Sequence, residues 1–178
     1  LGISIAQIRL VTTEAVDWPD GCLGIQEPGV ACTMAIVPGF RIVLEAQGRQ
    51  YEYRTNQDGS IVRPATLALR WHREGGIAGF CDDLIVYASG EVHAIGCKAS
   101  DGIAADSLRA VLSEAEMNQF NEWMTKFGAV TVKFEDPAVA DQMKVSLSLY
   151  GSGDGQPTEA ERQAIVTFAQ TVYDRVKP

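Results

Sequence analysis

Alternating apolar and polar residues predict a series of short strands along the first 60 positions. Ile8–Val16 and Phe40–Ala46 have strand-like composition, and Phe40–Ala46 alternates as a half-buried strand does. In Gln50–Thr55, two tyrosines fall on one face. Turn-forming residues separate these runs, at Pro19-Asp20-Gly21, Pro38-Gly39, Gln47-Gly48 and Asn56–Ser60. The pattern predicts an antiparallel meander of three or four strands.

Pro64-Ala65 is the expected boundary between two modules. After it, apolar and polar residues alternate again as in strands, and further along the apolar residues recur with helical spacing. The expected elements up to position 105 are a strand, a glycine-rich loop, a short apolar strand, a hairpin strand and a flexible connector: Thr66–Arg73, Glu74–Phe80, Leu84–Ala88, Glu91–Lys98 and Ala99–Ala105. Two further strands are expected at Val130–Phe134 and Lys144–Tyr150.

Two helices begin at capping boxes. Ser113-x-x-Glu116 begins the first helix, which Gly128 ends, and Thr158-x-x-Glu161 begins the second. Each helix carries one apolar stripe, formed by Met117, Phe120, Met124 and Phe127 in the first and by Ile165, Phe168, Val172 and Tyr173 in the second. An antiparallel sheet packed by two helices buries both stripes economically. The predicted fold class is therefore α+β: a β-meander module at residues 1–64, then an antiparallel sheet with two helices at residues 65–178.

Composition and charge narrow the class of partner. The 178 residues are 46% hydrophobic and 21% charged, as in ordinary folded proteins. The net charge of −8 repels phosphate backbones and anionic lipids, so we expect no nucleic acid and no bilayer surface as a partner. The chain begins Leu1-Gly2-Ile3 without a methionine, which indicates a processed or trimmed product. Membrane attachment is expected only through a missing N-terminal anchor.

The four cysteines indicate in which cellular compartment the protein folds. Their spacing favours the disulfides Cys22–Cys32 and Cys81–Cys97, because each pair brackets one local unit and neither has the short spacing of a zinc knuckle. Two disulfides favour an extracytoplasmic location, which is periplasmic, cell-surface or secreted. Four cysteines permit three pairings, and four buried free thiols in a cytosolic protein are the alternative.

The sequence contains no recognisable set of catalytic residues. Gly151–Gly155 follows a strand and precedes a helix, but Gln156 replaces the third glycine of a dinucleotide-binding loop, so a mobile, solvated loop is expected. His72 and His93 lie in strands, where structural roles are expected. Two aspartates after Cys81 disfavour a thiolate there. We predict no catalytic residue, no metal and no cofactor.

One loop remains as a candidate binding site. Its residues are Glu74, Gly75, Gly76, Ile77 and Phe80, and its three glycines permit left-handed backbone or close approach to another surface. Ile77 and Phe80 would dock on a partner if they are exposed. The alternative is a tight turn packed into the protein's own core.

Two resemblances add to these patterns. Trp18–Gly24 (WPDGCLG), Pro28-Gly29, Pro38–Leu44 and Tyr51–Thr55 resemble a small module of uncharacterised bacterial exported, lipoprotein-like, two-module proteins. This resemblance covers about the first 60 residues, and it implies no known activity. In such proteins a helix tends to precede the segment that begins at Leu1, which implies an N-terminal truncation here.

The second resemblance covers residues 66–150. A strand, the motif Gly75–Gly79 (GGIAG), a strand–turn–strand and a helix opened by Leu112-Ser113 are similar to bacterial emfourin-like proteins, a family that includes inhibitors of thermolysin-type metalloproteases. A disulfide candidate directly after the motif and a long C-terminal helix depart from that pattern. The resemblance implies positions to test, not established inhibitory contacts.

Together these observations favour an extracytoplasmic, non-catalytic binding protein, with a protease inhibitor as the specific form and a secreted protease as its partner. A structural module that interacts with an envelope component is the first alternative. An enzyme of unrecognised type is the second, and a deep pocket that holds His72 or His93 with a carboxylate would favour it.

Overall fold

The computed structural model describes residues 4–25, 30–77, 79–96, 107–135 and 142–177. Two compact units divide the chain, Leu1–Thr66 with Tyr87–Ser89 and Leu67–Val86 with Gly90–Pro178. The predicted connector Ala99–Ala105 lies outside the described residues. No helix within the described residues is long and apolar enough to cross a membrane.

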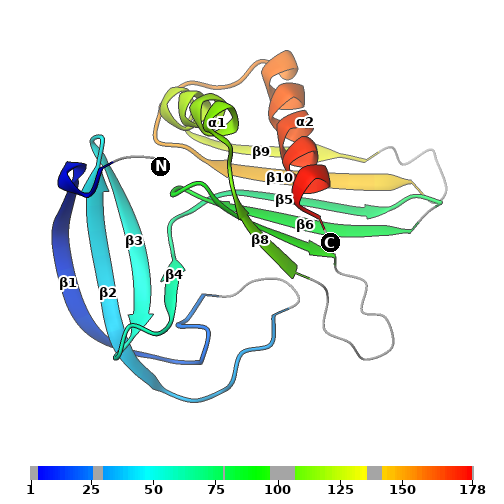
Figure 1. Cartoon of the computed structure of the whole chain (residues 1–178). Coiled ribbons are helices and arrows are strands. Elements are labelled where there is room, and N and C mark those ends of the chain that lie inside the picture. The colour runs from blue at the N-terminus through cyan, green and yellow to red at the C-terminus, as the bar shows by residue number, and fades with distance from the viewer. Residues whose placement is uncertain (1–3, 26–29, 78, 97–106, 136–141, 178) are drawn as a thin grey trace. The chain divides into compact units, whose positions relative to one another are not determined.

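The first unit contains the expected antiparallel meander (Figure 1). A single 3-10 turn, η1 (Ile5–Gln7), leads into four strands in the order β1-β2-β3-β4. The strands are β1 (Ile8–Trp18), β2 (Val37–Ala46), β3 (Arg49–Asn56) and β4 (Val62–Pro64). Gln47 and Gly48 both have positive φ, as a two-residue hairpin turn requires, and they join β2 to β3.

The predicted break at Pro38-Gly39 is wrong, because both residues lie within β2. The indole nitrogen of Trp18 donates a hydrogen bond to the carbonyl oxygen of Thr55 at 2.9 Å, and this bond crosses over Gly39. A Cβ at Gly39 would lie 1.8 Å from that oxygen and 2.8 Å from the indole nitrogen. The glycine is therefore a strand residue that makes room for the buried Trp18.

The second unit is a six-stranded sheet with two helices. Its strand order is β8-β7-β6-β5-β10-β9. The elements are β5 (Leu67–Gly75), β6 (Phe80–Tyr87), β7 (Glu91–Gly96), β8 (Ser107–Val111), α1 (Glu114–Lys126), β9 (Ala129–Phe134), β10 (Met143–Tyr150) and α2 (Glu159–Val176). Both helices begin at the predicted capping boxes, with Ser113 and Thr158 as N-caps.

The core of this unit lies between one face of the sheet and the helices (Figure 1). Alternate strand residues supply the sheet side of the core, and the buried stripes of α1 and α2 supply the other. The Phe168 ring stacks on Phe120, with centroids 6.2 Å apart, and meets Trp123 edge-on at 5.2 Å. The predicted α+β class, a meander followed by an antiparallel sheet packed by two helices, is confirmed.

The glycine string before α2 is not the free, solvated loop that the sequence suggests. Ser152 and Gly153 donate backbone hydrogen bonds to the carbonyls of Met124 and Phe127 at 2.8 and 2.9 Å, and Gly155 donates to Lys126 at 3.1 Å. These bonds satisfy carbonyl groups at the C-terminal end of α1, which would otherwise lack partners. The string is part of the helix-capping structure.

Candidate functional site

The candidate loop forms the turn of the β5–β6 hairpin. The amide of Gly79 donates a hydrogen bond to the carbonyl of Gly76 at 2.7 Å, which closes a four-residue turn. Gly75 has a φ of +88°, and a Cβ there would lie 2.3 Å from the carbonyl oxygen of Gln142. Conformation and close approach both require glycine at position 75. The turn is therefore held against the adjoining chain.

The side chain at the tip of this turn points into solvent. Ile77 has a relative exposure of 101%, so no described residue covers it. Phe80 and Met143 are 37% and 40% exposed, and Met143 pairs with Gly75 across β5 and β10. We call Ile77, Phe80 and Met143 the tip cluster. Of the two interpretations of the loop, packing into the protein's own core does not apply to Ile77.

A buried charged group anchors the base of the hairpin. The Arg73 guanidinium lies 4.3 Å from the centre of the Phe80 ring, and Arg73 is only 6% exposed. Its Nε donates to the Asp82 carboxylate at 2.8 Å, and the Tyr173 hydroxyl donates to the other Asp82 oxygen at 2.6 Å. Arg73, Asp82 and Tyr173, here called the anchor cluster, thereby join β5, β6 and α2.

Burial defines the chemistry of the anchor cluster. Desolvation raises the pKa of the Tyr173 hydroxyl well above its ordinary value of 10, and the hydrogen bond to Asp82 raises it further. The Trp71 ring lies 5.4 Å from the Tyr173 ring. The cluster is neutral overall when the phenol is protonated. Its Arg73 guanidinium lies against the Phe80 ring. Sequence reasoning missed it, although Arg73 on the Leu69–Trp71 side of the alternating strand was an available signal.

Strand alternation separates the predicted loop residues. Gly75, Gly76, Ile77 and Phe80 lie together at the turn, whereas Glu74 pairs in register with Lys144 and points to the face opposite the anchor cluster. On that face Glu74 lies 3.6 Å from the Nε2 atom of His72. The structure thus places Glu74 outside the tip cluster.

Both histidines lie on this second face of the sheet. His72 Nδ1 is 3.2 Å from Asp83 Oδ1, and the Asp83 carboxylate is buried. His93 is 2% exposed, with its Nε2 atom 3.4 Å from Glu91. Hollows in the described surface include those at Asn118–Lys126 on α1 and near Gly39 and Gln57 in the first unit. None of these hollows is lined by a histidine.

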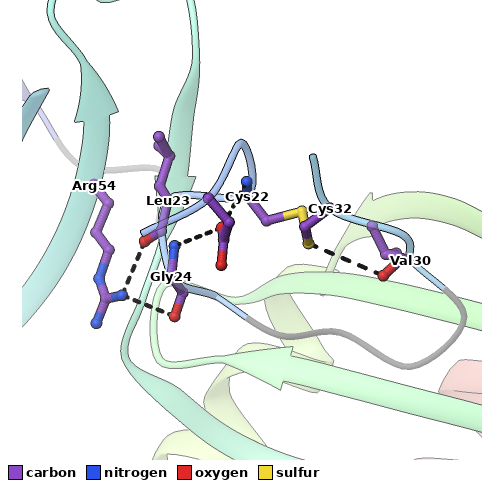
Figure 2. The surroundings of a disulfide bond; sticks show 7 residues. Cys22, Leu23, Gly24, Val30, Cys32 and Arg54 are labelled. Carbon is purple, nitrogen blue, oxygen red and sulfur yellow. Dashed lines mark hydrogen bonds between the residues drawn. A yellow bond between two sulfur atoms is a disulfide. The ribbon is translucent and has the colours of Figure 1, made fainter. Parts of the chain in front are cut away.

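The disulfide Cys22–Cys32 closes the loop between β1 and β2 (Figure 2). One carboxylate oxygen of Asp20 accepts backbone hydrogen bonds from Cys22 and Gly24, at 2.8 and 3.0 Å. Arg54 donates from Nη1 to the carbonyl oxygens of Leu23 and Gly24 at 3.0 and 3.1 Å. Its guanidinium also lies 4.8 Å from the centre of the Trp18 ring. The loop is tied to the sheet by backbone contacts as well as by sulfur.

The second predicted pair is described at one end only. Cys81 is disulfide-bonded, and no cysteine within the described residues is a free thiol. Cys97 lies outside the described residues. Within the described ranges, the one grouping with metal-ligand proximity is Asp20, Cys22 and Cys32, and its two sulfurs are consumed in the disulfide. That grouping does not fit a metal ion.

Comparison with known proteins gives one family and no activity. Residues 1–64 match the model of a family described as a domain of unknown function, DUF8738. No curated protein and no solved structure matches the chain. The match covers the first unit's meander and its disulfide loop, and it does not extend to the β5–β6 hairpin.

Proposed function

We propose that this chain is an extracytoplasmic, non-catalytic binding protein that contacts a protein partner through the tip cluster, with inhibition of a secreted protease as the specific form. The observation that carries the proposal is the complete exposure of Ile77 on a turn built around glycines. An aliphatic side chain at the apex of a hairpin contributes nothing to the core that folds this unit. Contact with a partner would remove the Ile77 side chain from water.

The energetics of the tip cluster favour docking into a pocket. Burying one large aliphatic side chain contributes about 1.5–3 kcal/mol, and Phe80 and Met143 add partly exposed area beside it. The turn is flanked by its Gly76–Gly79 hydrogen bond, by the pairing of Gly75 with Met143 and by the anchor cluster. Strand residues that are already fixed on both sides of Ile77 lose little conformational entropy on binding, so more of the contact energy appears as affinity.

Disulfide chemistry supports the compartment. Cys22–Cys32 and the disulfide at Cys81 persist in oxidising surroundings, such as the periplasm, the cell surface or the extracellular medium. The proposal assigns no catalytic step to the chain. His72 Nδ1 lies 3.2 Å from Asp83 Oδ1, and the hollows at Asn118–Lys126 and near Gly39 and Gln57 are lined by none of His72, His93 and Cys81.

A panel of secreted proteases tests the proposal. Peptide hydrolysis by a thermolysin-type metalloprotease, a serine protease and a cysteine protease is measured with increasing concentrations of the wild-type chain, of Ile77→Asp and of Val111→Asp. Val111 is 67% exposed on β8 and provides a matched apolar-to-acidic control. We expect inhibition of one class, lost in Ile77→Asp and retained in Val111→Asp. No inhibition of any class at micromolar concentrations would remove the inhibitor form and leave an envelope-interaction module.

A further inference from the structure

The long strand β1 is one of the two edge strands of the four-stranded sheet (Figure 1), the other being the three-residue β4. Within the part of the chain that the structure describes, no strand pairs with its outer side. Eight of its eleven residues are exposed. An edge of this length leaves a row of backbone donors and acceptors ready to pair with another strand.

The edge carries apolar side chains that a free edge usually lacks. Leu10 is 59% exposed, and Ile8 and Val11 are each 37% exposed. Natural sheets protect a free edge with proline, charged side chains or a β-bulge. β1 contains neither proline nor lysine, and its bulge and charges lie at positions that still allow pairing with a complementary strand.

A bulge determines which side chains share a face of this edge. The register shifts between Leu10 and Thr12, so that Val11 is an extra residue. Arg9 pairs with Glu45 and Glu14 pairs with Arg41, two positions of equal parity on β2. Arg9 and Glu14 therefore lie on the same face, although an unbulged strand would place them on opposite faces.

These positions are self-complementary under a two-fold axis. An antiparallel strand of identical sequence, centred on Thr12, sets Arg9 opposite Glu14 of the second copy and Glu14 opposite its Arg9. The same register sets Leu10 opposite Thr13 and Ile8 opposite Ala15, all on the other face. A two-fold interface repeats every contact twice, so the pairing gives two opposite-charge contacts and no like-charge contact.

We propose that β1 pairs with β1 of a second copy of this chain, joining two four-stranded sheets into one of eight strands. The charges at the edge favour a second copy over an arbitrary extended peptide, because Arg9 and Glu14 of one β1 lie opposite Glu14 and Arg9 of an antiparallel β1. The hairpin tip belongs to the other unit.

Charge reversal tests the register. Sedimentation equilibrium of the 178-residue chain, from micromolar to near-millimolar concentrations, is compared with that of Arg9→Glu, Glu14→Arg and the double reversal. We expect the wild type to dimerise, each single reversal to weaken the dimer by about tenfold or more, and the double reversal to restore it. A monomeric wild type, or a dimer that both single reversals leave unchanged, overturns the proposal.

A covalent test does not depend on how the charge variants fold. Thr12→Cys places a thiol on the proposed axis, where two copies are close enough for a symmetric disulfide. Under mild oxidation we expect a covalent dimer from Thr12→Cys and none from Ser60→Cys, an exposed site in the turn between β3 and β4. Equal cross-linking of the two variants contradicts pairing at β1.

Discussion

Removal of Arg73 tests whether the anchor cluster stabilises the second unit. Arg73 is 6% exposed, and its partner Asp82 has a side chain that is 13% exposed. Among the described residues, the Asp82 carboxylate in Arg73→Met keeps the Tyr173 hydroxyl as its side-chain partner. A buried charge that loses its counter-ion costs about 3–5 kcal/mol, so we expect a loss of that size in the free energy of unfolding. In Tyr173→Phe the ion pair remains, and the expected loss is about 1.5–3 kcal/mol.

The double variant Arg73→Met/Asp82→Leu separates charge from packing. It removes both charges and leaves apolar groups, a replacement that is often neutral in buried pairs. We therefore expect it to be more stable than Arg73→Met alone. Hydrogen exchange of α2 amides is the assay, because it reports this unit separately from the first. A loss below about 1 kcal/mol in Arg73→Met, or a double variant no more stable than the single one, would contradict a stabilising role for the buried ion pair.

Alkaline pH gives an independent check on Tyr173. Its pKa is raised in the folded state, so the stabilisation is complete below the unfolded value near 10 and is lost as pH rises above it. Tyr173→Phe lacks this ionisation. We expect the stability difference between wild type and Tyr173→Phe, measured by urea denaturation, to shrink above about pH 10. A difference that stays constant through that range would contradict the assignment.

Three further outcomes follow from local geometry. Gly39→Ala is expected to lower the stability of the first unit by about 2–4 kcal/mol in urea denaturation, because its Cβ displaces the Trp18–Thr55 hydrogen bond; an unchanged midpoint would contradict this. The hydrogen bond from Lys126 lowers the pKa of Glu161 to about 2, so the stability advantage of wild type over Glu161→Gln should be present above about pH 4.5 and lost as pH falls towards 2. Thermal scans across that range measure it, and an advantage independent of pH would count against the ion pair. Chain folded under oxidising conditions and then denatured without reductant should show no free thiols in a colorimetric assay. Four free thiols would contradict the proposed extracytoplasmic location.

Local patterns predicted the elements well where a single strand or helix decides the outcome. The capping boxes at Ser113 and Thr158 fixed both helix starts. Gly39 was misread as a break because glycine in a strand is indistinguishable from glycine in a turn until the Trp18 indole is placed over it. The strand Ser107–Val111 was not predicted, since it is defined by pairing with β7 and not by its own alternation.

The candidate site was predictable in its residues and not in its exposure. The sequence places Ile77 in a glycine-rich loop, but burial and exposure of that loop are equally compatible with its composition. The anchor cluster was beyond sequence reasoning, because Tyr173 and Asp82 are 91 positions apart. Only the packing of α2 on the sheet brings the phenol to the carboxylate. Long-range contacts of this kind are not encoded in any local period.

The decisive measurement is the inhibition constant of the purified chain against each of the three protease classes, beginning with a thermolysin-type metalloprotease. Wild type and Ile77→Asp are titrated against each enzyme with a fluorogenic peptide, alongside Val111→Asp as the control. We expect inhibition of one class by wild type, equal inhibition by Val111→Asp, and a constant weakened by about a hundredfold in Ile77→Asp, as expected for a hot-spot side chain. Equal inhibition by wild type and Ile77→Asp, or no inhibition of any class by wild type, would contradict an inhibitory role for the tip cluster.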